Sequence, residues 1–160
     1  MNVFRMIALP LTFLLCSGLA QAAEGLIVVK SNQSVAATAD KLEAVLSENG
    51  MKIMNRINHA AGAESAGLEL RPTEVVIFGN PKVGSPLMQC AQSVAVDLPQ
   101  KALIWEDDGG QVWLGYNDPE YLKTRHAIEG CDAALAKVSG ALAKFASAAS
   151  QPSMACLVFR

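Results

Sequence analysis

The stretch KALIWEDDGGQVWLGYN, residues 101–117, decides the predicted fold. Two β-rich segments, residues 101–106 and 111–117, flank Asp-Asp-Gly-Gly, a strong hairpin signal. A hairpin with helical segments nearby predicts an α+β fold, in which helices cover one largely antiparallel sheet. Pairing through this turn predicts the following opposite neighbours: Trp105 with Val112, and Ile104 with Trp113.

The remaining chain alternates predicted strands and helices in a single domain, residues 23–149. Strands are expected at residues 26–30, at 52–58, where polar and apolar residues alternate, and at 74–78. Capping residues and helical spacing predict the helices. They are expected at residues 35–49, at 86–94, from 119 and at 132–148, with a loop containing a helical turn at 60–66. The predicted order is β-α-β-β-α-β-β-α-α.

Residues 1–22 have the pattern of a cleaved signal peptide. Arg5 precedes a short apolar run, and a small-x-small site ends at Ala22. The run is shorter than the roughly 20 apolar residues of a spanning helix. We therefore expect cleavage after Ala22, a periplasmic or secreted protein, and no membrane span after signal removal. Residues 150–160 are expected to form a C-terminal tail that packs on the domain or on a partner.

The charge balance excludes some partners. The chain has 13 basic and 15 acidic residues, a net charge of −2, and loss of Arg5 makes it slightly more negative. This weak negative charge argues against a surface for nucleic acid or anionic membrane.

Three parts of the chain resemble a known family. They are LRPTEVVIFGNPKVGSPLMQ, DLPQKALIWEDDGGQVWLGYNDPEYLKTRH and the N-terminal strand–helix unit. They are similar to the domain-of-unknown-function family numbered 302, and more closely to its exported bacterial branch, over residues 26–147. The resemblance implies a compact α+β fold, often dimeric, and no established reaction. Many relatives carry cysteine where this chain has Gly79 and Gln100, so thiol or thiolate-metal chemistry does not transfer.

The loop GNPKVGSP, residues 79–86, is the main candidate site. Its glycines have P-loop spacing, but the lysine that should follow the second glycine is missing. A simpler anion site remains, with Ser85 capping the next helix, Pro86 at its first position and Lys82 nearby. The alternative is an ordinary connection, in which glycine and proline only shape the turn.

The histidines and one arginine are further candidates. His59 and His126 are predicted to meet with Asn80 and Lys82 between them, where two imidazoles bind a metal or exchange protons. The alternative for each is a surface or capping residue. Arg71 is a candidate for binding a ligand carboxylate, or for pairing with Glu69 or Glu74. No dense ligand motif indicates a metal, and the sequence names no cofactor.

Three cysteines remain after signal removal. An oxidising compartment favours a disulfide, and Cys90 with Cys131 is the preferred pair because Cys156 lies in the tail. The alternative is three small buried hydrophobic residues.

These features predict an exported binding module for a small anionic or polar ligand, or for a partner protein, at residues 79–86. One alternative is a small periplasmic enzyme in which His59 and His126 act, with Lys82 and Asn80 stabilising negative charge. Another is a structural homodimer without a ligand.

Overall fold

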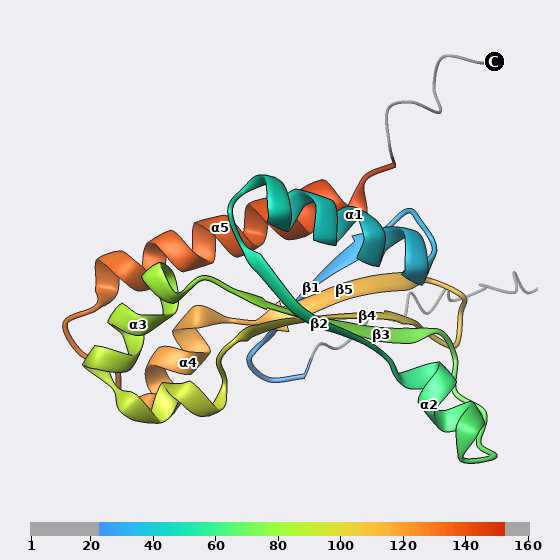
Figure 1. Cartoon of the computed structure of the whole chain (residues 1–160), viewed down its shortest axis with the longest axis horizontal. Helices are drawn as coiled ribbons and strands as arrows, with labels where there is room; N and C mark the ends of the chain where they lie inside the picture. Colours follow the sequence, from blue (N-terminus) through green and yellow to red (C-terminus); the bar gives the residue numbers. More distant parts are fainter. Residues whose placement is uncertain (1–22, 153–160) are drawn as a thin grey trace, which may run out of the picture.

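The computed structural model describes residues 23–152, which form one five-stranded sheet and its helices (Figure 1). The signal-peptide prediction and most of the predicted tail lie outside the described residues. The elements, in chain order, are β1 (Leu26–Ser31), α1 (Val35–Glu48), β2 (Lys52–Asn58), α2 (His59–Ser65), β3 (Thr73–Gly79), α3 (Pro81–Cys90), the 3₁₀ helix η1 (Gln92–Val96), β4 (Gln100–Glu106), β5 (Val112–Asn117), α4 (Pro119–His126) and α5 (Asp132–Ser150).

The sheet has the order β1-β5-β4-β3-β2, and all four pairings are antiparallel. Helix α1 carries the chain from one edge strand, β1, to the other, β2. The predicted α+β class and element order are confirmed, with α2 and η1 as additional short helices. The fold therefore follows from one antiparallel sheet with its long helices on one face.

The predicted hairpin register is wrong by one residue. Trp105 lies opposite Trp113, and Ile104 lies opposite Leu114. The reason is the turn, in which Asp107 N donates to Gln111 O at 2.9 Å and the Asp107 carboxylate accepts from two further backbone N–H groups. The Trp113 indole also donates to this carboxylate, and these bonds lower the pKa of Asp107.

The core lies between the sheet and the paired helices α1 and α5. Alternate side chains of the central strands face these helices, since successive residues of a strand point to opposite faces. The buried strand residues are Val76, Phe78, Ala102, Ile104, Leu114 and Tyr116. They meet apolar stripes on the helices, formed by Val35, Ala39, Leu42 and Leu46 of α1 and by Leu135, Val138, Leu142 and Phe145 of α5.

One charged group is buried in this layer and fully paired. The Glu74 side chain accepts a hydrogen bond from Arg56 Nε at 2.5 Å. Arg56 also pairs with Asp40 of α1, so the guanidinium links the sheet to the helix above it. The hydrogen bond to Glu74 is the largest cause of a raised pKa at Arg56. Because Glu74 is only 7% exposed, this partner offsets the cost of burying its charge.

Two helix predictions need correction. The third helix begins at Pro81 rather than at Pro86, so the greater part of GNPKVGSP is helical and Pro86 lies inside the helix. The segment after β2 is a short α-helix, α2, rather than a loop with one helical turn. In both cases an asparagine, Asn80 or Asn58, caps the helix through its side chain, a signal that the prediction did not use.

Candidate functional site

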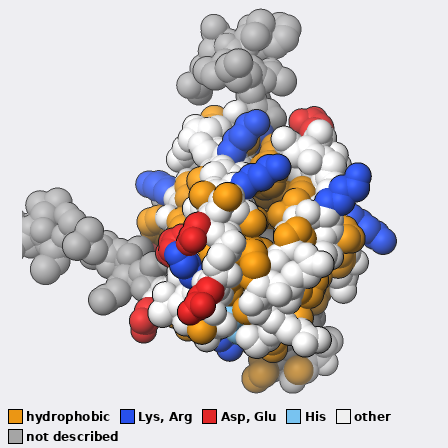
Figure 2. Space-filling view, turned by 90° about the vertical axis from the view of Figure 1, so that its left-hand side faces the viewer, with side chains coloured by type: hydrophobic (Ala, Val, Ile, Leu, Met, Phe, Trp, Pro, Cys, Tyr) orange, Lys and Arg blue, Asp and Glu red, His pale blue; other side chains and the backbone are white. Residues whose placement is uncertain are grey.

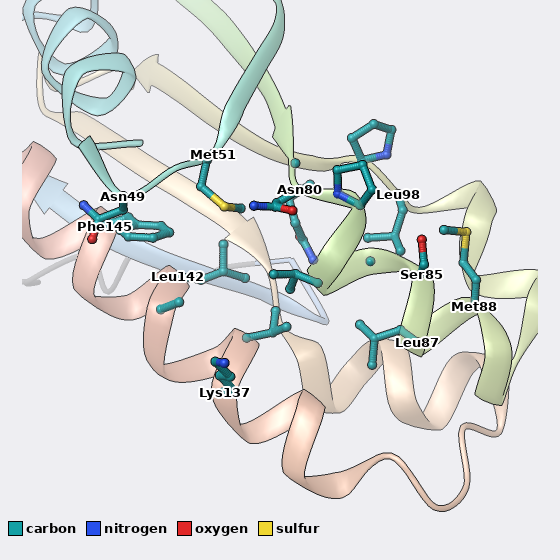
Figure 3. Close-up of a pocket in the computed structure, with 18 of the residues that line it drawn as sticks. Asn49, Met51, Asn80, Ser85, Leu87, Met88, Leu98, Lys137, Leu142 and Phe145 are labelled. Carbon is teal, nitrogen blue, oxygen red and sulfur yellow. The ribbon is translucent and has the colours of Figure 1, made fainter. Parts of the chain in front are cut away.

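A pocket of about 490 Å³ opens between α3, α5 and the adjoining ends of β2, β3 and β4 (Figure 3). This volume lies within the range of small-molecule sites. Its wall is mainly apolar, and Figure 3 shows Met51, Leu142 and Phe145 directed into the space between the two helices. The other apolar lining residues include Met54, Pro81, Val83, Leu87, Met88, Ala95, Leu98, Pro99, Val138 and Ala141.

The candidate loop builds one wall of this pocket. Strand β3 ends at Gly79, and Asn80 then starts α3: its side-chain oxygen accepts from Lys82 N at 2.9 Å. The Asn80 amide nitrogen donates to Gly50 O at 3.0 Å, which ties the start of α3 to the turn before β2. Asn80 and Ser85 both line the pocket. The loop is therefore part of a cavity wall.

The anion site expected at Ser85 and Pro86 is not present in the predicted form. Ser85 lies inside α3, so it does not cap a helix. At the true start of the helix, Val83 N and Gly84 N both donate to Asn80 O, and Lys82 N is bound by the Asn80 side chain. These N–H groups are already satisfied. Lys82 is exposed and does not line the pocket.

Gly79 and Gln100 both line the pocket. Gln100 is the first residue of β4 and lies opposite Phe78, on the face that meets the helices. It is only 7% exposed, and none of the described residues donates a hydrogen bond to its side-chain oxygen. An unpaired buried acceptor of this kind is costly and uncommon in folded proteins.

The charged residues on the pocket wall are both lysines. Lys137 and Lys144 of α5 are exposed and lie two helical turns apart, and no acidic residue of the described chain lines the cavity. Neither lysine forms an ion pair within residues 23–152. Figure 2 shows this end of the molecule, where hydrophobic side chains reach the surface and Lys or Arg side chains lie beside them. The pocket thus combines an apolar interior with a cationic rim.

The two histidines do not meet. His59 is exposed at the start of α2, while His126 ends α4 at the opposite end of the sheet (Figure 1). His126 Nε2 lies 2.6 Å from Asp97 Oδ2, and its Nδ1 lies 3.1 Å from Ser93 Oγ. Ser93, His126 and Asp97 thus form a Ser-His-Asp arrangement like that of a hydrolase triad. None of the three lines the pocket, and hydrolysis needs a concave site for the substrate. His126 connects α4 to the η1 segment.

Arg71 lies just before β3, at the opposite end of that strand from the pocket wall, and has its own partners. It pairs with Asp108 in the hairpin turn and donates from Nε to Glu106 O at 3.1 Å. The predicted pairing with Glu69 or Glu74 is therefore wrong, because the arginine reaches across to the neighbouring hairpin. It borders an open depression beside α2, together with Asn58 and Leu68, and contributes nothing to the pocket.

A disulfide joins Cys90, the last residue of α3, to Cys131, directly before α5. The two Cα atoms are 6.4 Å apart, within the usual disulfide range. The bond connects the two helices that form opposite walls of the pocket. Cys156 lies outside the described residues.

Residues 23–152 offer few candidates for metal binding or for crossing a membrane. No group of three or more His, Cys, Asp or Glu side chains in this part of the chain is placed to hold a metal ion. None of the helices in this part of the chain is both long enough and apolar enough to cross a membrane.

Sequence reasoning selected Asn80 and Ser85 but missed Gln100, Lys137, Lys144 and the methionines that line the cavity. The seven-residue spacing of Lys137 and Lys144 was a readable signal, because it places both on one side of a helix. The place of Gln100 on the pocket wall had no local signal, since it depends on how the start of β4 is positioned in the folded chain.

Two known proteins are similar in sequence to part of this chain. A Brucella suis protein named fluoride-specific ion channel FluC 1 is 48% identical over 104 residues, covering 65% of this chain and 41% of that protein. Its Brucella abortus counterpart has the same identity, with 38% of its length covered. The chain thus spans about two fifths of the length of these relatives.

A crystal structure of an uncharacterized conserved DUF302 protein from Bacillus stearothermophilus has the same fold. Its TM-score is 0.71 at 18% identity, and the match covers 79% of this chain and 99% of that one. The family model described as "Domain of unknown function DUF302" matches residues 27–145. This range includes most of α5 and all five strands, apart from the first residue of β1. The chain therefore belongs to the DUF302 family.

Proposed function

We propose that this protein is a binding module for a small amphipathic anion, held in the pocket between α3 and α5. The carrying observation is the pocket itself: an apolar cavity of about 490 Å³ whose charged lining residues, Lys137 and Lys144, are both cationic. An apolar ligand body gains roughly 25 cal/mol for each Å² removed from water. A negative group at the rim gains a modest contribution from each lysine and keeps its contact with solvent.

The arrangement favours binding over catalysis. Catalysis by His59 and His126 requires both rings at one pocket, and they lie at opposite ends of the sheet. His126 is engaged by Asp97 and Ser93. The lining side chains instead supply a concave, mainly apolar surface, which is the usual character of small-molecule sites.

The test is a matched pair of α5 variants. Ala141 lines the pocket, and the exposed Ala143 on the same helix does not, so Ala141→Phe fills the cavity and Ala143→Phe is the control. Binding is followed with the anionic dye anilinonaphthalene sulfonate and its displacement by medium-chain carboxylic acids. We expect Ala141→Phe to weaken binding by about tenfold or more, with the control unchanged. Equal binding by both variants would place the dye elsewhere and reject the proposal.

The rim lysines are tested with the same assay. The double variant Lys137→Ala/Lys144→Ala should weaken binding of the carboxylic acid by roughly twofold to fivefold, since exposed charge pairs contribute little. The matched alcohol should bind equally to both proteins. Lys82→Ala is the control variant, because it removes a lysine that does not line the pocket.

The relatives named fluoride-specific ion channels make fluoride a necessary probe. A small, strongly hydrated anion gains nothing from an apolar wall and loses its hydration there. We therefore expect fluoride not to displace the dye, whereas the amphipathic acids do.

A homodimer is a second candidate, supported by the outer face of the sheet. Helices α1 and α5 cover the inner face, while half-buried apolar side chains occupy the other: Val28, Val75, Ile77, Leu103, Trp105 and Trp113. Apolar patches of this kind mark interaction surfaces. Sedimentation should show a dimer that Leu103→Lys converts to a monomer; a monomeric unaltered protein at high concentration would contradict this.

We also propose that the protein is exported after cleavage of residues 1–22. The Cys90–Cys131 disulfide supports an oxidising compartment. Sequencing of the mature N-terminus should begin at Ala23, and a cytoplasmic protein that retains Met1 would contradict export.

A further inference from the structure

Among the described residues, Gln100 carries the one buried side-chain N or O atom that has no hydrogen-bond partner. The side chain lies on the wall of a mainly apolar cavity, its residue is 7% exposed, and its Oε1 has no hydrogen-bond donor among the described residues. Asn80, the neighbouring amide, is fully engaged: its oxygen accepts from Lys82 N and its nitrogen donates to Gly50 O. Asn80 therefore builds the wall, whereas Gln100 is left with an unused acceptor.

The surroundings of Gln100 supply no donor. Leu98 and Pro99 precede it, Phe78 lies opposite it on β3, and the facing helix contributes apolar side chains such as Leu142 and Phe145. A buried carbonyl oxygen without a donor carries the full cost of its lost hydration. A ligand that brings an O–H or N–H group to this point removes the cost, whereas a purely hydrocarbon ligand does not.

We infer that the pocket selects amphipathic acids that carry a hydrogen-bond donor at the end remote from the charge, and that this donor binds Gln100 Oε1. The inference rests on the proposed function and specifies its ligand class: an apolar body, an anionic group beside Lys137 and Lys144, and a hydroxyl or N–H group at the inner end. Gln100 sets specificity, and the apolar wall sets most of the affinity.

Three probes of equal length test this assignment by calorimetry. They are a straight-chain carboxylic acid ending in a hydroxyl, the same acid ending in a methyl, and the same acid ending in a methyl ketone. The hydroxyl is a donor, the ketone only accepts, and the methyl does neither. We expect the hydroxyl-ended acid to bind about fivefold to tenfold more tightly than the methyl-ended acid, with the ketone no better than the methyl.

Gln100→Met removes the acceptor and keeps an unbranched side chain of similar size. The preference for the hydroxyl-ended acid should disappear, while the methyl-ended acid binds at least as tightly as before. Gln92→Met is the matched control, because Gln92 is exposed on η1 and does not line the pocket. It should retain the full preference. The probe series on the unaltered protein decides the matter even if Gln100→Met does not fold.

The outcomes separate this inference from the proposed function. Equal binding of all three acids to the unaltered protein would overturn the role of Gln100 and leave the amphipathic pocket intact. A preference for the ketone would also overturn it, since Gln100 would then act as a donor. Failure of every acid to bind would reject the proposed function, and the inference with it.

Discussion

Two buried polar side chains on neighbouring strands, Glu74 and Gln100, are treated very differently by the rest of the molecule. Both face the helices and both are 7% exposed. Glu74 on β3 is bound by Arg56, which also reaches Asp40 on α1. Gln100 on β4 has no donor for its oxygen among the described residues and lines a cavity.

The difference teaches how to distinguish a structural polar group from a binding one. Burying a polar atom is costly unless a partner is supplied. At Glu74 the chain supplies that partner from β2, and the pair holds the sheet against α1. Gln100 has no such partner among the described residues, and it lies on the wall of the pocket between helices that a disulfide joins. The first region has its partner within the chain, and the second has an unused acceptor, which we propose a ligand fills.

Loss of the disulfide is expected to have the largest effect on the free energy of unfolding. Cys90→Ala/Cys131→Ala removes a bond between residues 41 apart in the chain, which should lower the free energy of unfolding by about 3 kcal/mol. Urea unfolding without reductant measures the loss. Dye binding at the pocket should weaken as well, because α3 and α5 are no longer joined. An unchanged unfolding midpoint would show that packing alone holds this end.

Arg56→Met should lower the free energy of unfolding by about 2 kcal/mol, because it leaves the Glu74 carboxylate buried without its partner. The control is Arg56→Met/Glu74→Leu, which removes both charges and should recover much of the loss. The same urea experiment measures both proteins. If the double variant is no more stable than the single one, Arg56 stabilises the fold through its other contacts, with Asp40 and Ala36.

Gln100→Met should change the free energy of unfolding in the opposite direction and by a smaller amount. In the ligand-free protein, replacing an unsatisfied buried amide by an apolar side chain should raise the free energy of unfolding by about 1 kcal/mol. Thermal unfolding of ligand-free protein checks the direction, with Gln92→Met as the control that changes nothing. A clear destabilisation would mean that Gln100 already contributes to the fold, and the contrast with Glu74 would be lost.

The fold was largely predictable because its signals are local. The hairpin residues 101–117, the helical stripes of α1 and α5 and the capping of α4 by Asp118 each specify their own element. The register error arose at the turn, where the carboxylate of Asp107 organises a loop one residue longer than the simplest hairpin. The sequence predicted a start for α3 at Pro86 rather than at Pro81 because Ser85-Pro86 and Asn80-Pro81 are equally good helix starts.

The site was only partly predictable because it is made by tertiary contacts. The loop contributes Asn80 and Ser85, but Met51 directly precedes β2, and Lys137 and Lys144 come from α5. Nothing in the neighbourhood of His59 or His126 indicates that the sheet separates them. Which helix N–H groups stay free depends on the capping asparagine, and here they are all bound.

The most direct test of the amphipathic pocket uses the methyl groups of methionine. Met51, Met54 and Met88 all line the cavity, and they come from both its β2 side and its α3 side. In protein labelled at these methyls, NMR titration with the hydroxyl-ended acid should shift all three signals together and saturably, and Ala141→Phe should abolish the shifts. Signals that stay unchanged up to the solubility limit of the acid, or that shift equally in Ala141→Phe, would contradict a binding site between α3 and α5.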